Sequence, residues 1–444
     1  MSYRPAEIQP GYGKRPSRGF DPWIAIAFLY PLTQLVWFDF FGQFYLTDFA
    51  GLALLLMMVQ MPDARRRLGD IRFVLFLLGL WLFGQVATDL YRATSPENFL
   101  RGWGRIVFFG LQIVALWLFL PRKREYMIAY AFGLGIASIV GVPAQYEEYG
   151  WKFGYGFGLE LIIAAATCLT VPFFGSLRRY APWIFLAAAV LLLLKDARSM
   201  FAMSVIAGGI CALALTLEKF PRLQKRINPL VFVSFLLVGI AATSLIATVY
   251  ANAAESGMLG EKARIKYVAQ SSGDVPLLLG GRPESLVSII AIQDAPILGH
   301  GSWAQDRHYT VLYHTIRKRL GIQFPKADLM ETGRIPAHSF FFGSWVEAGI
   351  LGAVFWLYLF FLPMFAIYQI IRRSDPSLPL IAFTAVSLTW NIPFSPFGAS
   401  ERFTTAAAIV ILFWALRAAG FDSRSLVPRR RGPKIQTRQY APAE

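Results

Sequence analysis

Long apolar segments recur along this chain, and short segments rich in charge, proline or glycine separate them. A helix needs about 20 mostly apolar residues to cross roughly 30 Å of hydrocarbon, and no sustained strand-like alternation favours a barrel. The pattern predicts an all-α polytopic membrane protein with about twelve transmembrane helices. The predicted spans are 23–40, 45–61, 72–90, 104–120, 126–143, 157–175, 181–195, 199–217, 229–250, 339–366, 378–394 and 403–419.

These spans divide the chain into five parts. Residues 1–22 are polar and basic and show no removable signal peptide, so they are predicted to stay in the cytoplasm. Nine helices follow over 23–250, then one large insert over 251–338, then three helices over 339–419. Residues 420–444 form a basic tail.

The insert carries two helical patterns of its own. PESLVSIIAIQDA, with Pro283 where a first helical turn tolerates it, predicts a short helix that Pro296 and the following glycines end. WAQDRHYTVLYHTIRKRL, 303–320, predicts a second helix. Leu312, Ile316 and Leu320 repeat along one side of it, which favours packing along the membrane surface or over the helix bundle.

Composition and charge agree with this topology. The chain is 56% hydrophobic and 16% charged, far more apolar than a soluble domain. With a cytoplasmic N-terminus, 26 of the 43 Lys and Arg residues fall on the cytoplasmic side, 7 in the short loops opposite and 10 in the insert. Because basic loops stay in the cytoplasm, both termini are predicted inside and the insert outside. The net charge of +16 is therefore mostly a topological signal, and no nucleic-acid-binding module accompanies it.

Three polar residues are predicted at one face of the membrane. Arg198 begins the eighth helix, Arg282 follows two glycines in the insert, and His338 directly precedes the tenth helix. Arginine forms paired bonds to phosphate oxygens, and histidine exchanges a proton near neutral pH, so a diphosphate leaving group suits the set. Arginines at the interface that reach headgroups, and a histidine that only forms a hydrogen bond, are the structural alternative.

Two more charged residues are candidates for substrate binding. Glu347 lies within the tenth helix, about 13 Å along it from His338, where a carboxylate needs a partner or a cavity. A packing role and a site role are both open for it. Arg105, near the outer end of the fourth helix, is placed to assist the site.

Metal and nucleotide chemistry are not predicted. His300, His308 and His314 match no common zinc spacing, and neither HExxH nor a phosphate-binding GxxxxGK[ST] is present. The prediction is no metal and no cofactor. A reaction on the outer face must then use a donor that carries its own activated bond.

The sequence GGRPESLVSIIAIQDAPILGHGSW, followed by PAHSFFFGSWVEAGILG, resembles the signature region of the O-antigen ligase and O-antigen polymerase superfamily of bacterial membrane proteins. KDARSM looks like the family's Ser-Arg helix start, with Ala197 where serine is frequent, and Ser339 stands where asparagine is commoner. The resemblance covers roughly 282–352 and the many-helix layout around it.

The resemblance implies metal-independent glycosyl transfer at the periplasmic face of the bacterial inner membrane. A glycan would pass from undecaprenyl diphosphate to an acceptor sugar hydroxyl, with other polysaccharide-assembly proteins as further partners. Arg198 and Arg282 would neutralise the departing diphosphate, and His338 would accept or orient the hydroxyl proton. Polymerase and ligase differ only in the acceptor and stay open. A transporter or flippase of lipid-linked sugars and a non-catalytic scaffold are the competing classes.

Overall fold

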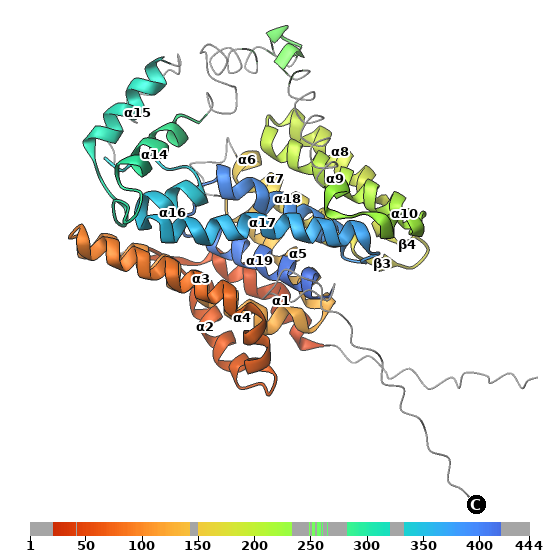
Figure 1. Ribbon diagram of the computed structural model, residues 1–444. Helices are drawn as coiled ribbons and strands as arrows, with labels where there is room; N and C mark the ends of the chain where they lie inside the picture. The colour runs from red at the N-terminus through yellow and green to blue at the C-terminus, as the bar shows by residue number, and fades with distance from the viewer. Residues whose placement is uncertain are drawn as a thin grey trace, which may run out of the picture.

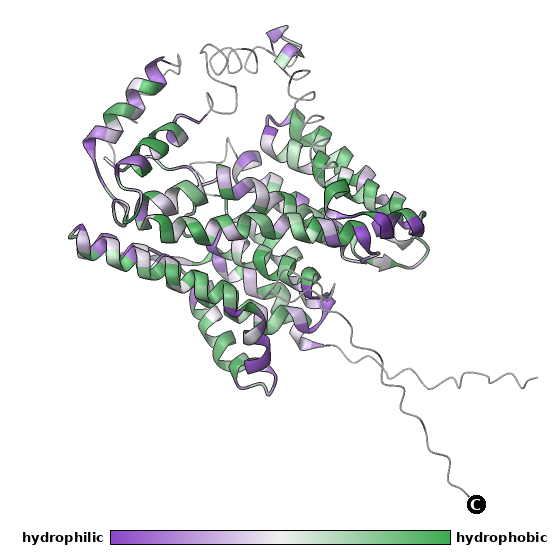
Figure 2. Cartoon of the chain, in the orientation of Figure 1, coloured by the Kyte–Doolittle hydropathy of each residue, from purple (hydrophilic) through white to green (hydrophobic). Residues whose placement is uncertain are grey.

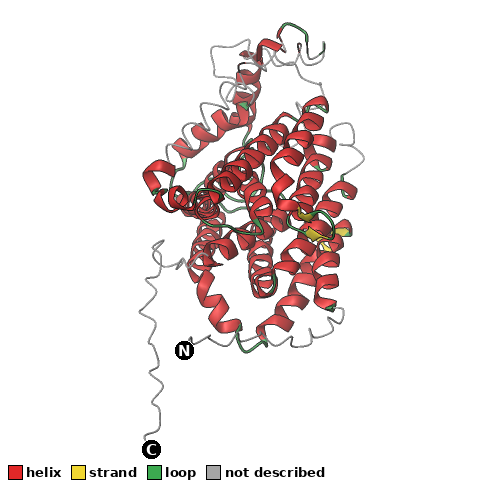
Figure 3. Ribbon diagram, turned by 90° about the vertical axis from the view of Figure 1, so that its right-hand side faces the viewer, coloured by secondary structure: helices red, strands yellow, loops and turns green. Residues whose placement is uncertain are grey.

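The computed structural model describes residues 21–40, 42–142, 150–232, 282–319 and 333–418, with scattered positions between 248 and 264. These residues are mostly helical, and the strands among them form two short antiparallel hairpins (Figures 1 and 3). The α-helices are α1 (Pro22–Leu29), α2 (Leu46–Val59), α3 (Ala64–Tyr91), α4 (Pro96–Phe119), α5 (Arg124–Val140), α6 (Gly150–Phe153), α7 (Tyr155–Thr167), α8 (Ala181–Leu194), α9 (Arg198–Glu218), α10 (Pro221–Arg226), α14 (Pro283–Asp294), α15 (Arg307–Arg319), α16 (Phe340–Ala348), α17 (Ile350–Arg372), α18 (Leu378–Phe394) and α19 (Glu401–Ala418). Short 3-10 helices are η1 (Tyr30–Leu35), η2 (Leu120–Arg122) and η4 (Leu177–Tyr180), and the strands are β1 (Trp37–Asp39), β2 (Gln43–Tyr45), β3 (Thr170–Val171) and β4 (Gly175–Ser176).

Five of the described helices are long and apolar enough to cross a membrane. They are Ala64–Tyr91, Pro96–Arg122, Leu177–Leu194, Arg198–Glu218 and Ile350–Arg372, and four shorter apolar helices accompany them. Each predicted span from 23–40 to 199–217, and each from 339–366 onward, overlaps a helix. Most of the predicted span 229–250 lies outside the described residues. The all-helical prediction is confirmed, and the count of twelve spans stays a prediction.

Two predicted spans are too long at their C-terminal ends. The 23–40 span stops at Leu35, and Trp37–Asp39 instead pairs with Gln43–Tyr45 in the hairpin β1–β2. The 157–175 span stops at Thr167, and β3 pairs with β4. Both misread segments are rich in phenylalanine, which suits a strand as well as a helix. Apolarity alone could not tell the two apart.

The predicted 339–366 helix is broken in two at Gly349, which has φ +67°. Ile350 N–H donates to the carbonyl of Ile297 at 3.2 Å, and a Cβ on Gly349 would lie 1.8 Å from that same oxygen. Only glycine permits so close an approach in this left-handed conformation. The insert segment 297–301 therefore docks into the break between α16 and α17.

Helices α14 and α15 pack on each other beside α16 (Figure 1). They share a second, smaller core in which Val287 and Ala291 of α14 meet Val346 of α16. Leu312 and Ile316 of α15 pack against it, so the predicted apolar stripe is a packing face. Helix α15 begins at Arg307, four residues later than the pattern predicts.

The described loops gather into two groups at opposite ends of the bundle. At one end, Arg178 forms an ion pair with Glu218, Arg122 with Asp63, and Arg417 with Asp70. All these residues belong to segments predicted as cytoplasmic. At the other end, Arg92 Nε donates to the carbonyl of Gly299 at 3.0 Å, which joins the end of α3 to the insert. Figure 2 shows apolar residues along the central helices and hydrophilic residues on α15 and around α10.

Candidate functional site

His338 and Arg282 lie within electrostatic range of each other at the insert end of the bundle. The pKa of His338 is lowered by partial desolvation of the ring and by the positive charges of Arg282 and Lys152, while Glu284 acts in the opposite direction. Lys152 comes from α6 and Glu284 from the first turn of α14. His338 keeps an exposed face, so a substrate hydroxyl can reach it. The structure thus brings two of the predicted residues together and adds two neighbours that the sequence pattern did not mark.

The segment that carries His338 is fixed on both sides. Ser288 of α14 donates to the carbonyl of Pro336 at 3.0 Å. Ser339 caps α16, because its Oγ accepts from the Phe342 N–H at 3.1 Å and also donates to the carbonyl of Ile392 in α18 at 2.9 Å. The imidazole therefore sits on a backbone held by α14, α16 and α18.

Arg282 is held at the C-terminal end of α18. Its guanidinium donates to the carbonyl of Phe394 and lies over the Phe394 and Trp390 rings at 4.7 and 5.6 Å. Burial lowers the pKa of Arg282, and Glu284 partly opposes this effect. The helix-end carbonyl and the aromatic faces orient the charge, and Arg282 forms no ion pair with the residues that the structure describes.

Arg198 lies at the first turn of α9, where its Nε is 3.0 Å from Asp196 Oδ1. Lys195 and Asp196 form the turn before α9, and Lys195 Nζ lies 5.6 Å from the centre of the Trp151 ring in α6. The same short helix contributes Lys152, whose charge acts on His338. Helix α6 thus connects the Arg198 turn with the Arg282 and His338 pair, and Figure 1 shows it between α16 and the α8–α9 pair.

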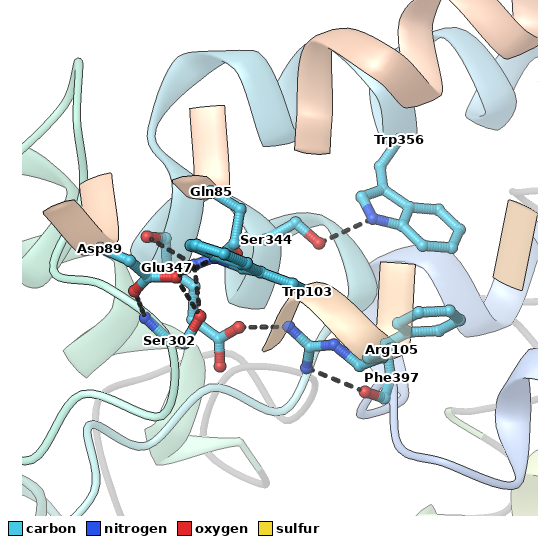
Figure 4. A network of polar contacts seen from close by, with 9 residues as sticks. All are labelled: Gln85, Asp89, Trp103, Arg105, Ser302, Ser344, Glu347, Trp356 and Phe397. Atoms are coloured by element: carbon cyan, nitrogen blue, oxygen red, sulfur yellow. Dashed lines mark hydrogen bonds and ion pairs between the residues drawn. The ribbon is translucent and has the colours of Figure 1, made fainter. Parts of the chain in front are cut away.

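Glu347 and Arg105 form an ion pair some distance along α16 from His338 (Figure 4). Their side chains are 14% and 12% exposed, and Arg105 also donates to the carbonyl of Phe397 at 3.3 Å. Glu347 therefore has the partner that a carboxylate at this depth requires.

Asp89, which the sequence reading missed, anchors the insert to α3. Its carboxylate accepts from the backbone N–H and the hydroxyl of Ser302, both at 2.6 Å, and from Trp103 Nε1 at 2.8 Å. Gln85 completes this network in Figure 4 through a 2.9 Å bond to the Ser302 hydroxyl. An acidic residue at the end of the apolar stretch of α3 was the available signal in the sequence.

A cavity of about 760 Å³ lies beside the His338 segment. Its wall includes Ala337 and Ser339, the residues on either side of His338, together with Arg105 and Glu347. Arg334, another residue that the sequence reading missed, lies 3.4 Å from the centre of the Trp303 ring on the same wall. The backbone segment that carries His338 also lines the cavity, so the cavity lies next to this histidine.

The Arg105–Glu347 pair gives a stability prediction. Replacing Glu347 by leucine leaves a nearly buried arginine without its carboxylate, which costs about 3–5 kcal/mol of folding free energy. The double variant Arg105→Met/Glu347→Leu should recover most of that loss. Thermal unfolding of the purified detergent-solubilised variants measures both, and equal stability of the single variant and the parent protein would contradict the assignment.

No family model, curated protein or solved structure matches this chain. The fold and the site define a mostly helical protein with a polar site at one end of the bundle, and the described part of the chain contains five helices that could span a membrane.

Proposed function

We propose that the chain is a glycosyltransferase of the bacterial inner membrane, a polymerase or ligase of surface polysaccharide. It transfers a glycan from undecaprenyl diphosphate to a sugar hydroxyl at the periplasmic face. The observation that carries the proposal is that the arginine Arg282 lies within electrostatic range of His338, whose pKa is lowered mainly by desolvation. An imidazole and a guanidinium within electrostatic range of each other supply the base and the leaving-group clamp that such a transfer needs.

The proposed step exchanges one carbon–oxygen bond for another and moves one proton. The acceptor hydroxyl loses its proton to His338 as its oxygen bonds to the anomeric carbon of the donor glycan. The anomeric carbon–oxygen bond breaks, and the undecaprenyl diphosphate leaves with the electron pair. Arg282 neutralises the charge that develops on the diphosphate, and Arg198 assists from the start of α9.

The grouping of loops supports the membrane arrangement in the proposal. Segments predicted as cytoplasmic from their basic residues contact one another, as Arg124 does with Ser377 at 2.9 Å. Segments predicted outside meet at the other end, where Arg402 Nη2 lies 3.4 Å from the carbonyl of Gln43. Both termini would then be cytoplasmic, and the insert 251–338 with its active face would be periplasmic.

The test is transfer by the purified protein in liposomes. With an undecaprenyl-diphosphate-linked glycan as donor, we expect new glycosidic product and release of undecaprenyl diphosphate, and EDTA should leave the rate unchanged because arginines carry the leaving-group charge. Movement of the glycolipid between leaflets with no new glycosidic bond would instead identify a flippase. In a deletion strain, unpolymerised single repeats indicate a polymerase, and long lipid-linked glycan without attachment to the lipid A core indicates a ligase.

A further inference from the structure

The cavity beside His338 has a mixed polar and aromatic wall. Residues of α15, α16, 333–337 and 396–398 contribute to this wall. Tyr313 on this wall donates to Glu284 at 2.7 Å, and Glu284 is the carboxylate that acts on His338. A molecule in the cavity would therefore lie next to the proposed reaction site. Its volume of about 760 Å³ is within the usual range for a small-molecule site.

Positive charge exceeds negative charge on this wall. Arg105, Arg307 and Arg334 line it together with Asp306 and Glu347. Glu347 is already paired with Arg105, whereas the guanidinium of Arg334 stacks on Trp303. Burial and the nearby charges of Arg105 and Arg101 lower the pKa of Arg334 to about 10, although Glu347 opposes this. An anionic group in the cavity would relieve this crowding of positive charge.

Trp303 is held in a strained conformation on the cavity wall. Its φ is +55°, which a bulky residue rarely adopts, and the bonds from the preceding Ser302 to Asp89 fix it there. Arg334 and Arg101 lie 3.4 and 5.9 Å from its ring centre. Strained backbone conformations are frequent at binding sites, where contacts with the surrounding structure hold them in place. Here the strained conformation sets an aromatic face and two guanidiniums in one place.

We propose that this cavity binds an acidic saccharide, whose sugar carboxylate contacts Arg334 and whose hydroxyl groups contact Asp306 and Glu347. The inference rests on the proposed function, in which this saccharide belongs to the acceptor glycan. A diphosphate fits the cavity less well, because the wall has a surplus of only one positive charge and a bound diphosphate carries two negative charges. A saccharide with one carboxylate uses the surplus arginine and donates hydroxyl hydrogens to the two acidic side chains.

The test is equilibrium binding to the full chain in detergent, with two probes. One is a disaccharide that carries a uronic acid, and the other is the same disaccharide with a primary alcohol in place of the carboxylate. We expect the acidic probe to bind about tenfold or more tightly than the neutral one, and Arg334→Gln to abolish that preference. Arg319→Gln removes an exposed arginine that lies off the cavity wall and should change nothing. Equal binding of the two probes by the parent protein would overturn the proposal.

A second variant covers the case in which Arg334→Gln fails to fold. A Cβ on Gly343 would make an ordinary contact with the Ala337 Cβ, at 3.7 Å, so the Gly343→Leu side chain can project into the cavity and occupy part of it. It should weaken binding of the acidic disaccharide at least tenfold. Inorganic pyrophosphate that competes with that disaccharide, and loses affinity in Arg334→Gln, would reassign the cavity to the donor diphosphate and overturn the proposal.

The two proposals can fail separately. His338→Ala should bind the acidic disaccharide as the parent protein does while it forms no glycosidic product. Transfer with no preference for the acidic disaccharide in binding would reject the cavity assignment alone. Preferential binding without transfer by the parent protein would reject the glycosyltransferase and keep the acidic-saccharide site.

Discussion

Replacing His338 by alanine is expected to reduce glycosyl transfer by about 10²–10⁴-fold, the usual contribution of a positioned general base. The loss should fall on the rate and leave the amount of folded protein unchanged, because His338 is exposed and the Ser339 cap of α16 remains. Product formation in the liposome assay measures the rate, and thermal unfolding measures the fold. A variant with normal transfer at a normal protein level would remove His338 from the mechanism.

The pH profile of transfer shows whether His338 acts as a general base or has only a structural role. A base must be neutral, and the lowered pKa of His338 keeps it neutral further into the acid range than an ordinary imidazole, whose pKa is near 6.5. The acid limb of the profile should therefore lie below pH 6.5. Lys152→Gln removes a charge that lowers the pKa of His338, so its limb should move to higher pH.

Glu284→Gln should shift the acid limb of the pH profile in the opposite direction. The carboxylate of Glu284 favours the protonated imidazole, so its removal should move the acid limb to lower pH. Identical acid limbs in the parent protein and both variants would show that another group controls the profile.

The helices were predictable because long apolar segments have few ways to fold in a bilayer. Hydropathy locates α8 and α9 to within about a residue at either end. Hydropathy fails where backbone geometry decides at which residue a helix ends. At Gly349, the close approach of Ile297 ends α16. Hydropathy also fails where β-forming residues follow a helix, as in the β3–β4 hairpin. Neither feature changes mean hydropathy, so a periodicity argument cannot detect it.

The site was predictable only in part. The sequence marked Arg282 and His338 because each stands at the edge of an apolar segment, and the structure places their charges within range of each other. Glu347 and Arg105 were named separately, and only the tertiary structure brings these side chains of α16 and α4 together. Arg334 was missed because its role comes from Trp303, and only tertiary structure brings that ring beneath it.

The position of Arg198 was predictable from the sequence, but its contacts were not. Its position at the start of α9 followed from the sequence, and the structure adds an ion pair with Asp196. Helix α6 lies between that turn and His338. The distance from Arg198 to Arg282, which decides whether both can contact one diphosphate, therefore depends on how α6 packs. We therefore expect Arg282 to carry more of the leaving-group charge than Arg198.

Replacing Arg282 by lysine is expected to reduce transfer by about 10²–10³-fold, although the charge is conserved. A loss of this size is usual when one preorganised hydrogen-bond donor is removed from the place where negative charge develops in the transition state. Arg282 holds its position through one N–H that donates to the Phe394 carbonyl and through stacking on the Phe394 ring, which leaves the other N–H groups of its planar fork for the diphosphate. A lysine ammonium can satisfy the carbonyl or the diphosphate, but it cannot stack and chelate at once.

The matched control for this variant is Arg179→Lys, which makes the same chemical change at an exposed arginine of the opposite end. Arg179 donates to the Phe174 carbonyl at 3.0 Å, so it too loses a backbone contact. Its transfer rate should stay within about twofold of the parent rate, since surface substitutions away from a site have small effects. Because the diphosphate leaves in every transfer, whatever the acceptor, the Arg282→Lys loss should appear with every acceptor tested. A loss confined to one acceptor would place Arg282 on the acceptor and remove it from the leaving group.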